Sequence, residues 1–319
     1  MSLIRTACPT DDPALHALWR ECFGAGAGAA PQLPALYALD PDRHRRTFVA
    51  VRADGTLDAV VVYVPRAIRD AQGTPVRVGG IGSVAARPEA RGRGLVRALL
   101  AEAAELMRAE SCAWSLLFTG VPGVYTGSGW QTFPTRLRAG ALGSTPLARS
   151  PYKIRPARPA DLPFLTQLSR SAAPLSTVRS EADWHTRLPA WYGPLRGWLV
   201  AEDPNTNRPV GWATAAHHEG AGKAEGAVDV REYAATGAGP LAALFAAIAG
   251  RARRAGLRWA LLRGPEPGPA VLEALPHLMT GAEVRTEHVG MVRPLLAGPE
   301  RVHAVPRAPG AVHWFGDSF

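Results

Sequence analysis

The sequence has few cysteines and no long apolar run, and each shortage excludes a class of protein. Its three cysteines, Cys8, Cys22 and Cys112, lie far apart and include no Cys-x-x-Cys pair, which argues against a disulfide framework and a zinc site. No stretch approaches the roughly 20 apolar residues of a membrane helix, and the first residues lack the apolar core of a signal peptide. We therefore expect a reduced, cytoplasmic protein with no membrane partner and no metal.

Lysine is also scarce, so arginine supplies almost all of the positive charge in a chain of formal net charge +9. A basic balance of this kind can indicate a nucleic-acid partner. However, alanine, glycine and proline are abundant together with arginine, as expected when codon composition favours all four. The sequence also has no basic stripe interleaved with aromatic residues. We therefore favour a protein that does not bind nucleic acid.

The 319 residues, 47% of them apolar, are enough for two domains of about 150 residues each. The segment that begins at Ile4 recurs at Ile154, with Ile, Arg, Ala, Pro, Asp, Pro and Leu at matching positions. In each copy an aspartate, Asp11 or Asp161, can accept main-chain N–H bonds at the start of an amphipathic helix. This match indicates an internal repeat.

A second match, at a shift of 145, aligns residues 91–100 with residues 236–245. Two matches at nearly the same shift predict a tandem duplication, in which each half reads strand, helix, helix, hairpin, strand, helix, strand, helix, strand. The fold class is therefore α/β, with mixed (α+β) sheets in two tandem domains. The predicted limits are 1–143 for the first domain, 144–151 for a linker, 152–295 for the second domain and 296–319 for a C-terminal tail. Hairpin turns are expected at residues 53–56 and 203–207.

A glycine-rich turn follows a predicted strand and opens an amphipathic helix. Gly92 and Gly94 let the backbone fold closely there, and the first helical turn offers unpaired N–H groups and the positive end of the helix dipole to an anion. Arg91, Arg93 and Arg97 add positive charge. The pattern suits a pyrophosphate, although a plain strand–helix turn with exposed arginines would look the same.

This segment resembles the GNAT family of acyl-CoA N-acyltransferases. The family signature R/Q-x-x-G-x-G/A is met by Arg91, Gly94 and, less closely, Val96, and Tyr125 stands four residues before a Gly-Trp pair, as in the family. The run GRGLVRALL is similar to the enhanced-intracellular-survival (Eis) type, which has tandem acetyltransferase domains. Only 24 residues follow the second predicted domain, so we expect no counterpart of the third domain of that type.

The resemblance implies an acetyl-CoA-dependent N-acetyltransferase that acts on a small-molecule or peptide primary amine by direct attack. It implies Tyr125 as the general acid for the leaving thiolate. In Eis-type enzymes a terminal Phe carboxylate reaches the active site, and this chain ends in an apolar tail at Phe319, which we therefore expect to act as base or anchor. The residues implied to bind acetyl-CoA are Val84, Ala85, Ala86, Arg91, Gly92, Arg93, Gly94, Leu95, Val96 and Arg97.

The second half departs from the signature at matching positions. Arg91 corresponds to Thr236 and Tyr125 to Ala270, and Pro240 removes one of the amides that a phosphate would use. We therefore predict a degenerate second domain and acetyl-CoA binding in the first domain alone. A non-catalytic acyl-CoA- or RNA-binding regulator remains the alternative. The acceptor, the general base and a homo-oligomeric state stay open.

Overall fold

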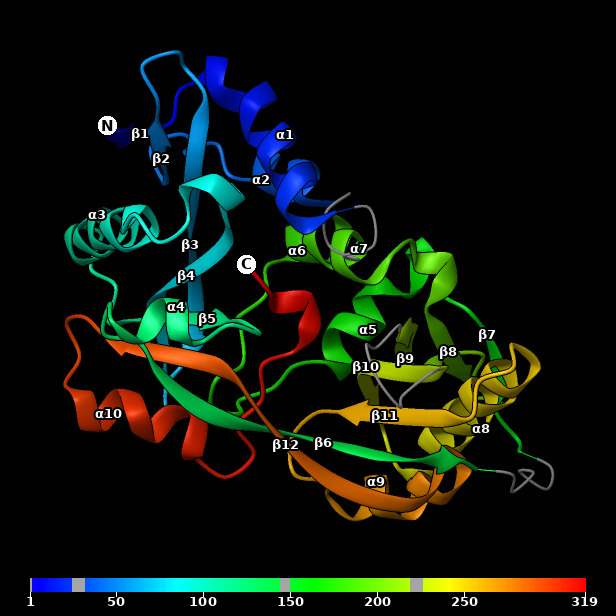
Figure 1. Ribbon diagram of the computed structural model, residues 1–319. Coiled ribbons are helices and arrows are strands. Elements are labelled where there is room, and N and C mark those ends of the chain that lie inside the picture. Colours follow the sequence, from blue (N-terminus) through cyan, green and yellow to red (C-terminus); the bar gives the residue numbers. More distant parts are fainter. Residues whose placement is uncertain (1, 25–31, 144–149, 219–225) are drawn as a thin grey trace.

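The computed structural model describes residues 2–24, 32–143, 150–218 and 226–319 (Figure 1). Most of the Gly/Ala-rich segment 24–30 and of the predicted linker 144–151 lies outside the described residues. The elements of the first half are β1 (Leu3–Thr6), α1 (Asp12–Phe23), α2 (Leu33–Ala38), β2 (Thr47–Val51), β3 (Leu57–Arg69), β4 (Pro75–Ala86), α3 (Leu95–Ala109), β5 (Trp114–Phe118), α4 (Gly123–Thr126) and β6 (Gln131–Leu142).

The second half repeats this order, with three described helices after its first strand. Its elements are β7 (Lys153–Pro156), α5 (Leu162–Leu168), α6 (Glu181–His185), α7 (Arg187–Tyr192), β8 (Leu199–Glu202), β9 (Pro209–His218), β10 (Ala227–Ala235), α8 (Ala238–Arg254), β11 (Trp259–Arg263), α9 (Pro269–Ala274) and β12 (Met279–Pro294). The tail adds α10 (Pro299–Ala304). Both predicted hairpins are present, as β2–β3 and β8–β9.

The strands form one twelve-stranded sheet in the order β1-β2-β3-β4-β5-β12-β6-β11-β10-β9-β8-β7. The order is symmetric, because the first five strands of each half flank the central pair β12 and β6. In each half one pair is parallel, β4–β5 or β10–β11, and the other pairs are antiparallel. The predicted α/β fold with a mixed sheet is confirmed.

The central pair shows that each half passes its last strand to the other half (Figure 1). β6 belongs to the first half by sequence but pairs with β11 of the second half, and β12 pairs with β5 of the first half. β6 and β12 also pair with each other along most of their length. The two halves are therefore joined through continuous main-chain hydrogen bonds, and the predicted domain limits divide the sequence rather than the sheet.

The repeated N-terminal turn has the same structure in both halves. Asp11 accepts the main-chain N–H of Cys8 at 2.8 Å, and Asp161 accepts that of Arg158 at 2.7 Å, as the repeat predicts. Each aspartate also pairs with an arginine of the preceding strand, at 2.7 Å in both copies. This pairing holds the first strand of each half against the start of its first helix.

Helices cover both faces of the first-half sheet. On one face α3 packs Leu99, Leu100 and Met107 against β3 and β4. On the other face α1 packs Leu18 and Trp19 against the same strands. α10 and the tail pack beyond α1 on that second face, against β4, β5 and β12. The second face is therefore where the end of the chain meets the first half.

Among the described residues, no helix is long and apolar enough to cross a membrane. No group of three or more His, Cys, Asp or Glu side chains among them is arranged to hold a metal ion.

Candidate active site

The turn between β4 and α3 presents a row of main-chain amides. Gly92 and Gly94 have φ values of +74° and +77°, in the left-handed region that favours glycine. Within the described residues, the N–H groups from Gly92 to Arg97 donate no hydrogen bond, and Ala98 is the first to do so, to the carbonyl of Gly94 at 3.1 Å. Free amides at a helix N-terminus suit an anion.

Three exposed arginines surround this turn. Arg91 donates from Nε to the carbonyl of Ala86 at 3.2 Å. Arg93 lies 3.5 Å from the buried carboxylate of Asp58. Arg97, on the first turn of α3, forms no ion pair with a described residue. Because exposed contacts of this kind contribute little free energy, all three side chains can turn towards a phosphate.

An open strand edge lies beside this turn. β4 and β5 pair only where Val78–Gly80 meets Trp114–Leu116, and then they separate. The separated part of β4 contains a bulge at Ser83, which has φ +52° and whose carbonyl accepts a hydrogen bond from Trp19 Nε1 at 2.9 Å. Beyond the bulge, one edge of residues 84–86 lies along β3, where Ala85 pairs with Val60 and Ala86 with Ala59. The other edge can pair with an extended chain as an added strand.

Tyr125 lies in α4, the first helix after β5. Its side chain is buried, with 7% of the residue exposed, and its ring packs edge-on against Trp130 at a centroid distance of 6.5 Å. Burial, which outweighs a contact with Thr119, raises the pKa of Tyr125 to about 12. The phenol is therefore protonated at neutral pH and can donate a proton but not accept one.

The tail ends against β4, beside the separated strands (Figure 1). A Cβ on Gly80 would collide with the ring of Phe319, and a Cβ on Gly82 would lie 2.5 Å from the main-chain carbonyl carbon and oxygen of Phe319. The two glycines thus make the space that Phe319 occupies. Because Gly82 directly precedes the bulge at Ser83, the last residue reaches the edge where β4 leaves β5.

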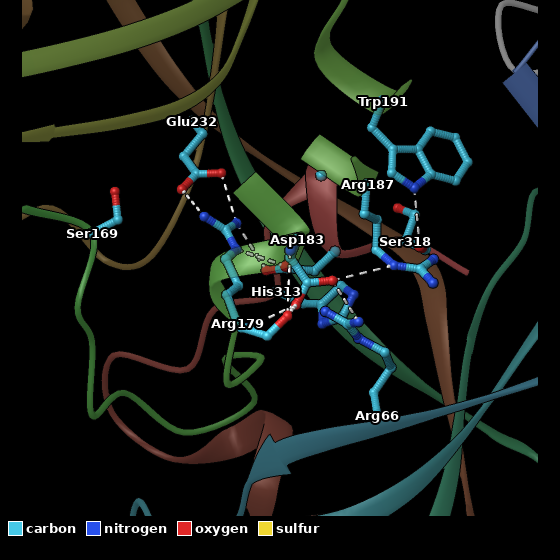
Figure 2. Close-up of polar contacts among 12 residues, drawn as sticks. Arg66, Ser169, Arg179, Asp183, Arg187, Trp191, Glu232, His313 and Ser318 are labelled. Atoms are coloured by element: carbon cyan, nitrogen blue, oxygen red, sulfur yellow. Dashed lines mark hydrogen bonds and ion pairs between the residues drawn. The ribbon is translucent and has the colours of Figure 1, made fainter. Parts of the chain in front are cut away.

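A buried ion network fixes the tail to the second half (Figure 2). Arg179, whose side chain is 8% exposed, donates to both oxygens of Glu232 at 2.7 and 2.8 Å and to both oxygens of Asp317 at 2.8 and 3.0 Å. Tyr192 donates from its hydroxyl to Glu232, and the same hydroxyl accepts the main-chain N–H of Gly316 at 2.8 Å. The turn just before the chain end is therefore held from both sides.

A second cluster joins the halves beside this network (Figure 2). Arg66 of β3 donates to Asp183 of α6 at 2.9 Å, and Arg187 of α7 lies 3.6 Å from the same carboxylate. Burial lowers the pKa of Arg187 to about 10. One turn further along α7, Trp191 Nε1 donates to the carbonyl of Ser318 at 3.1 Å. Neither cluster can be predicted from the sequence, because its members are far apart in the chain and share no motif.

The matching place in the second half is closed. α8 contains the buried Pro240, which has no N–H, in its first turn. The ring of Tyr152 covers Gly239, since a Cβ there would lie 3.1 Å from it. An anion would therefore meet an aromatic ring and fewer amides at the start of α8.

Replacing Gly94 tests the backbone geometry of the turn. We expect Gly94→Ala to lower the free energy of unfolding by about 1 kcal/mol, because a residue with a Cβ is strained in the left-handed region, whereas the added Cβ would meet no atom within 4 Å. Thermal unfolding measures the change. The control is Gly120→Ala, where an added Cβ is equally free of contacts and φ lies outside that region. A loss no larger than the control's would contradict the strain.

Comparison with known proteins identifies the domain that carries this site. Residues 4–133 match the family described as acetyltransferase (GNAT) domain. The matched stretch contains the free amides, the separated strands and Tyr125. Residues 4–133 are therefore a GNAT acetyltransferase domain, and the protein is an acyltransferase that uses acetyl-CoA.

Solved structures extend the likeness to almost the whole chain. A conserved protein from Enterococcus faecalis V583 has a TM-score of 0.68 at 16% identity, covering 93% of this chain and 73% of that one. A GCN5-related N-acetyltransferase from Anabaena variabilis has a TM-score of 0.67 at 15% identity, covering 92% and 73%. Eis1 from Mycobacterium abscessus has a TM-score of 0.60 at 15% identity, covering 93% and 74%. At these identities the likeness shows the fold. No curated protein matches the chain.

Proposed function

We propose that the first half transfers an acetyl group from acetyl-CoA to a primary amine by direct attack, with one acetyl-CoA bound per chain. The observation that carries the proposal is that two groups lie close to β4. Phe319 contacts Gly82, and Tyr125 belongs to the same buried cluster as Ile81. The acetyltransferase match favours an enzyme over the non-catalytic regulator left open by the sequence.

The donor would be held by main-chain groups. The amides of residues 92–97 would bind the pyrophosphate, with Arg91, Arg93 and Arg97 adding charge. The free edge of residues 84–86 would pair with the pantetheine arm. Acetyl-CoA so bound would place its thioester where β4 and β5 separate.

Tyr125 would protonate the departing thiolate. A thiol has a reference pKa of about 8.5, whereas burial raises the pKa of Tyr125 to about 12. The transfer is therefore less favourable than reference values suggest. The same burial also disfavours a thiolate formed beside the phenol, which reduces the difference.

The amine would meet the end of the tail. In a chain that ends at Phe319, the group against Gly82 is an α-carboxylate, which can hold an ammonium ion and take its proton directly or through a water. Arg179 and Trp191 support this placement, because they fix Asp317 and Ser318 just before it. The ring of Phe319 fills the space over Gly80 and so helps to hold the last residue in place.

We expect a stoichiometry of one acetyl-CoA per chain. Each lost charged hydrogen bond costs about 1.5–3 kcal/mol, and the second half lacks the arginines of the turn and one of its amides. Isothermal titration calorimetry with acetyl-CoA measures the ratio. A ratio near two would contradict the proposal.

A thiol-release assay with a panel of amines tests the activity. We expect acetyl-CoA consumption to depend on the amine, with an N-acetyl product for the amines that are used. Release of thiol at the same rate with every amine and with none would contradict acetyl transfer to an amine.

A further inference from the structure

A cavity of about 900 Å³ lies between the second-half strands and the tail. Its walls come from β6, β10, β11 and β12 on one side and from tail residues 306–315 on the other. Phe118, at the end of β5, and Ser318, next to Phe319, also line it. Ser318 therefore places one end of the cavity next to the last residue of the chain.

Two charged residues of the cavity wall occupy the strand positions at which the first half has Gly80 and Gly82. Counted from the first parallel pair in each half, Asp229 and Arg231 in β10 take the places of Gly80 and Gly82 in β4. In the first half the two glycines have no side chains, and Phe319 fills the space above them. In the second half the two side chains line the cavity instead.

Arginines outnumber carboxylates in this wall. The charged lining residues are Arg136, Arg138, Arg231, Arg263, Arg307, Asp229, Glu266 and Glu287. Every carboxylate among them already has an arginine partner. Arg263 lies 3.2 Å from Asp229 and 3.1 Å from Glu287, and Glu266 pairs with Arg138 at 3.1 Å. A polycationic acceptor would have to compete with these arginines for each carboxylate.

Among the half-buried arginines of the wall, which are Arg138, Arg231 and Arg263, Arg231 has the weakest hydrogen-bond and ion-pair partners. Its guanidinium lies 4.1 Å from the ring centre of Phe315. Among the described residues its Nε has no hydrogen-bond acceptor, its Nη1 is 3.5 Å from the carbonyl of Trp191, and Asp229 is 4.0 Å away and closer to Arg263. Burial lowers the pKa of Arg231. A ligand anion would supply the missing acceptor.

Most of the uncharged residues of the wall are apolar or aromatic. Phe133, Tyr233 and Trp314 line the same cavity, and Trp314 packs edge-on against Tyr233 at 5.6 Å. Resting on the proposed function, we propose that the acceptor is an aromatic or apolar amine that also carries a carboxylate. Arg231 binds the carboxylate, the aromatic side chains contact the body of the ligand, and the amino group faces Phe319.

A matched pair of probes tests this assignment. Benzylamine and 4-(aminomethyl)benzoate share an amine and a ring and differ in the carboxylate. Calorimetry in the presence of CoA should give a dissociation constant at least fivefold lower for the benzoate, a preference that Arg231→Gln reduces below twofold. Acetyl-CoA affinity serves as the folding check for the variant. The control Arg196→Gln, an exposed arginine outside the cavity, should keep the preference.

The outcomes separate this inference from the proposed function. The inference would be overturned if the two probes bound equally well or if the preference for the benzoate survived Arg231→Gln. It would also be overturned if spermidine bound more tightly than the benzoate. Selective binding of the benzoate without thiol release from any amine would support the ligand class and contradict the acetyl transfer. Thiol release that is equally fast with both probes would support the acetyl transfer and overturn the ligand class.

Discussion

Tyr125→Phe is expected to lower kcat about 100-fold and to leave the dissociation constant of acetyl-CoA within about twofold. General acid catalysis contributes roughly 10²–10⁴-fold in rate, and the phenol is the proton donor that the proposed reaction assigns to the leaving thiolate. The ring remains in place in phenylalanine, so its packing against Trp130 persists. Steady-state kinetics and calorimetry on the same preparation measure both quantities.

A matched variant and a pH profile control this result. Tyr152→Phe removes a phenol at the closed site of the second half and should leave kcat within about twofold. Because the pKa of Tyr125 is raised to about 12, the acid stays protonated below that pH, and its ionisation should cause no loss of kcat up to about pH 10. A kcat reduced less than threefold in Tyr125→Phe would show that the thiolate leaves without this proton.

Removal of Ser318 and Phe319 is expected to lower kcat at least tenfold, about 1.4 kcal/mol of barrier, with acetyl-CoA affinity nearly unchanged. The deletion removes the group against Gly82 but keeps Asp317, whose two hydrogen bonds from Arg179 hold the rest of the tail. The acceptor would then lose its anchor or base while the donor site at α3 stays intact. Thiol-release kinetics on the shortened chain measure the loss.

A point substitution checks the same contact without shortening the chain. Gly82→Ala places a Cβ 2.5 Å from the Phe319 main chain and should displace it, whereas Gly120→Ala meets no atom within 4 Å and should be silent. An extension by a few residues beyond Phe319 moves the carboxylate but keeps the ring. Normal turnover in the shortened and extended chains would contradict a catalytic part for the carboxylate.

The local features of the fold could be predicted from the sequence. The repeat predicted two similar halves, and the aspartates of the repeated turn accept the main-chain N–H groups expected of them. The turn at Gly92 and Gly94 was predicted because left-handed glycines before an amphipathic helix leave a sequence pattern. These features depend on residues that are close together in the chain.

The exchange of β6 and β12 could not be predicted in the same way. Periodicity identifies a strand but not its partner, and the two exchanged strands are equivalent members of a repeat. Pairing of β12 with β5 joins Met291 to Leu117, residues more than 170 positions apart.

The position of the tail could likewise be predicted only in part. Its aromatic residues predicted docking, yet Arg179 and Glu232, which hold Asp317, carry no pattern that points to a tail.

The most direct test of the account is to follow an isotopically labelled acetyl group from acetyl-CoA in the presence of an amine that the protein uses. The account predicts one labelled N-acetyl product for each thiol released, and no label on the protein at any time in the reaction. Thiol release without an N-acetyl product, or labelled acetyl bound covalently to the protein before it reaches the amine, would contradict direct transfer.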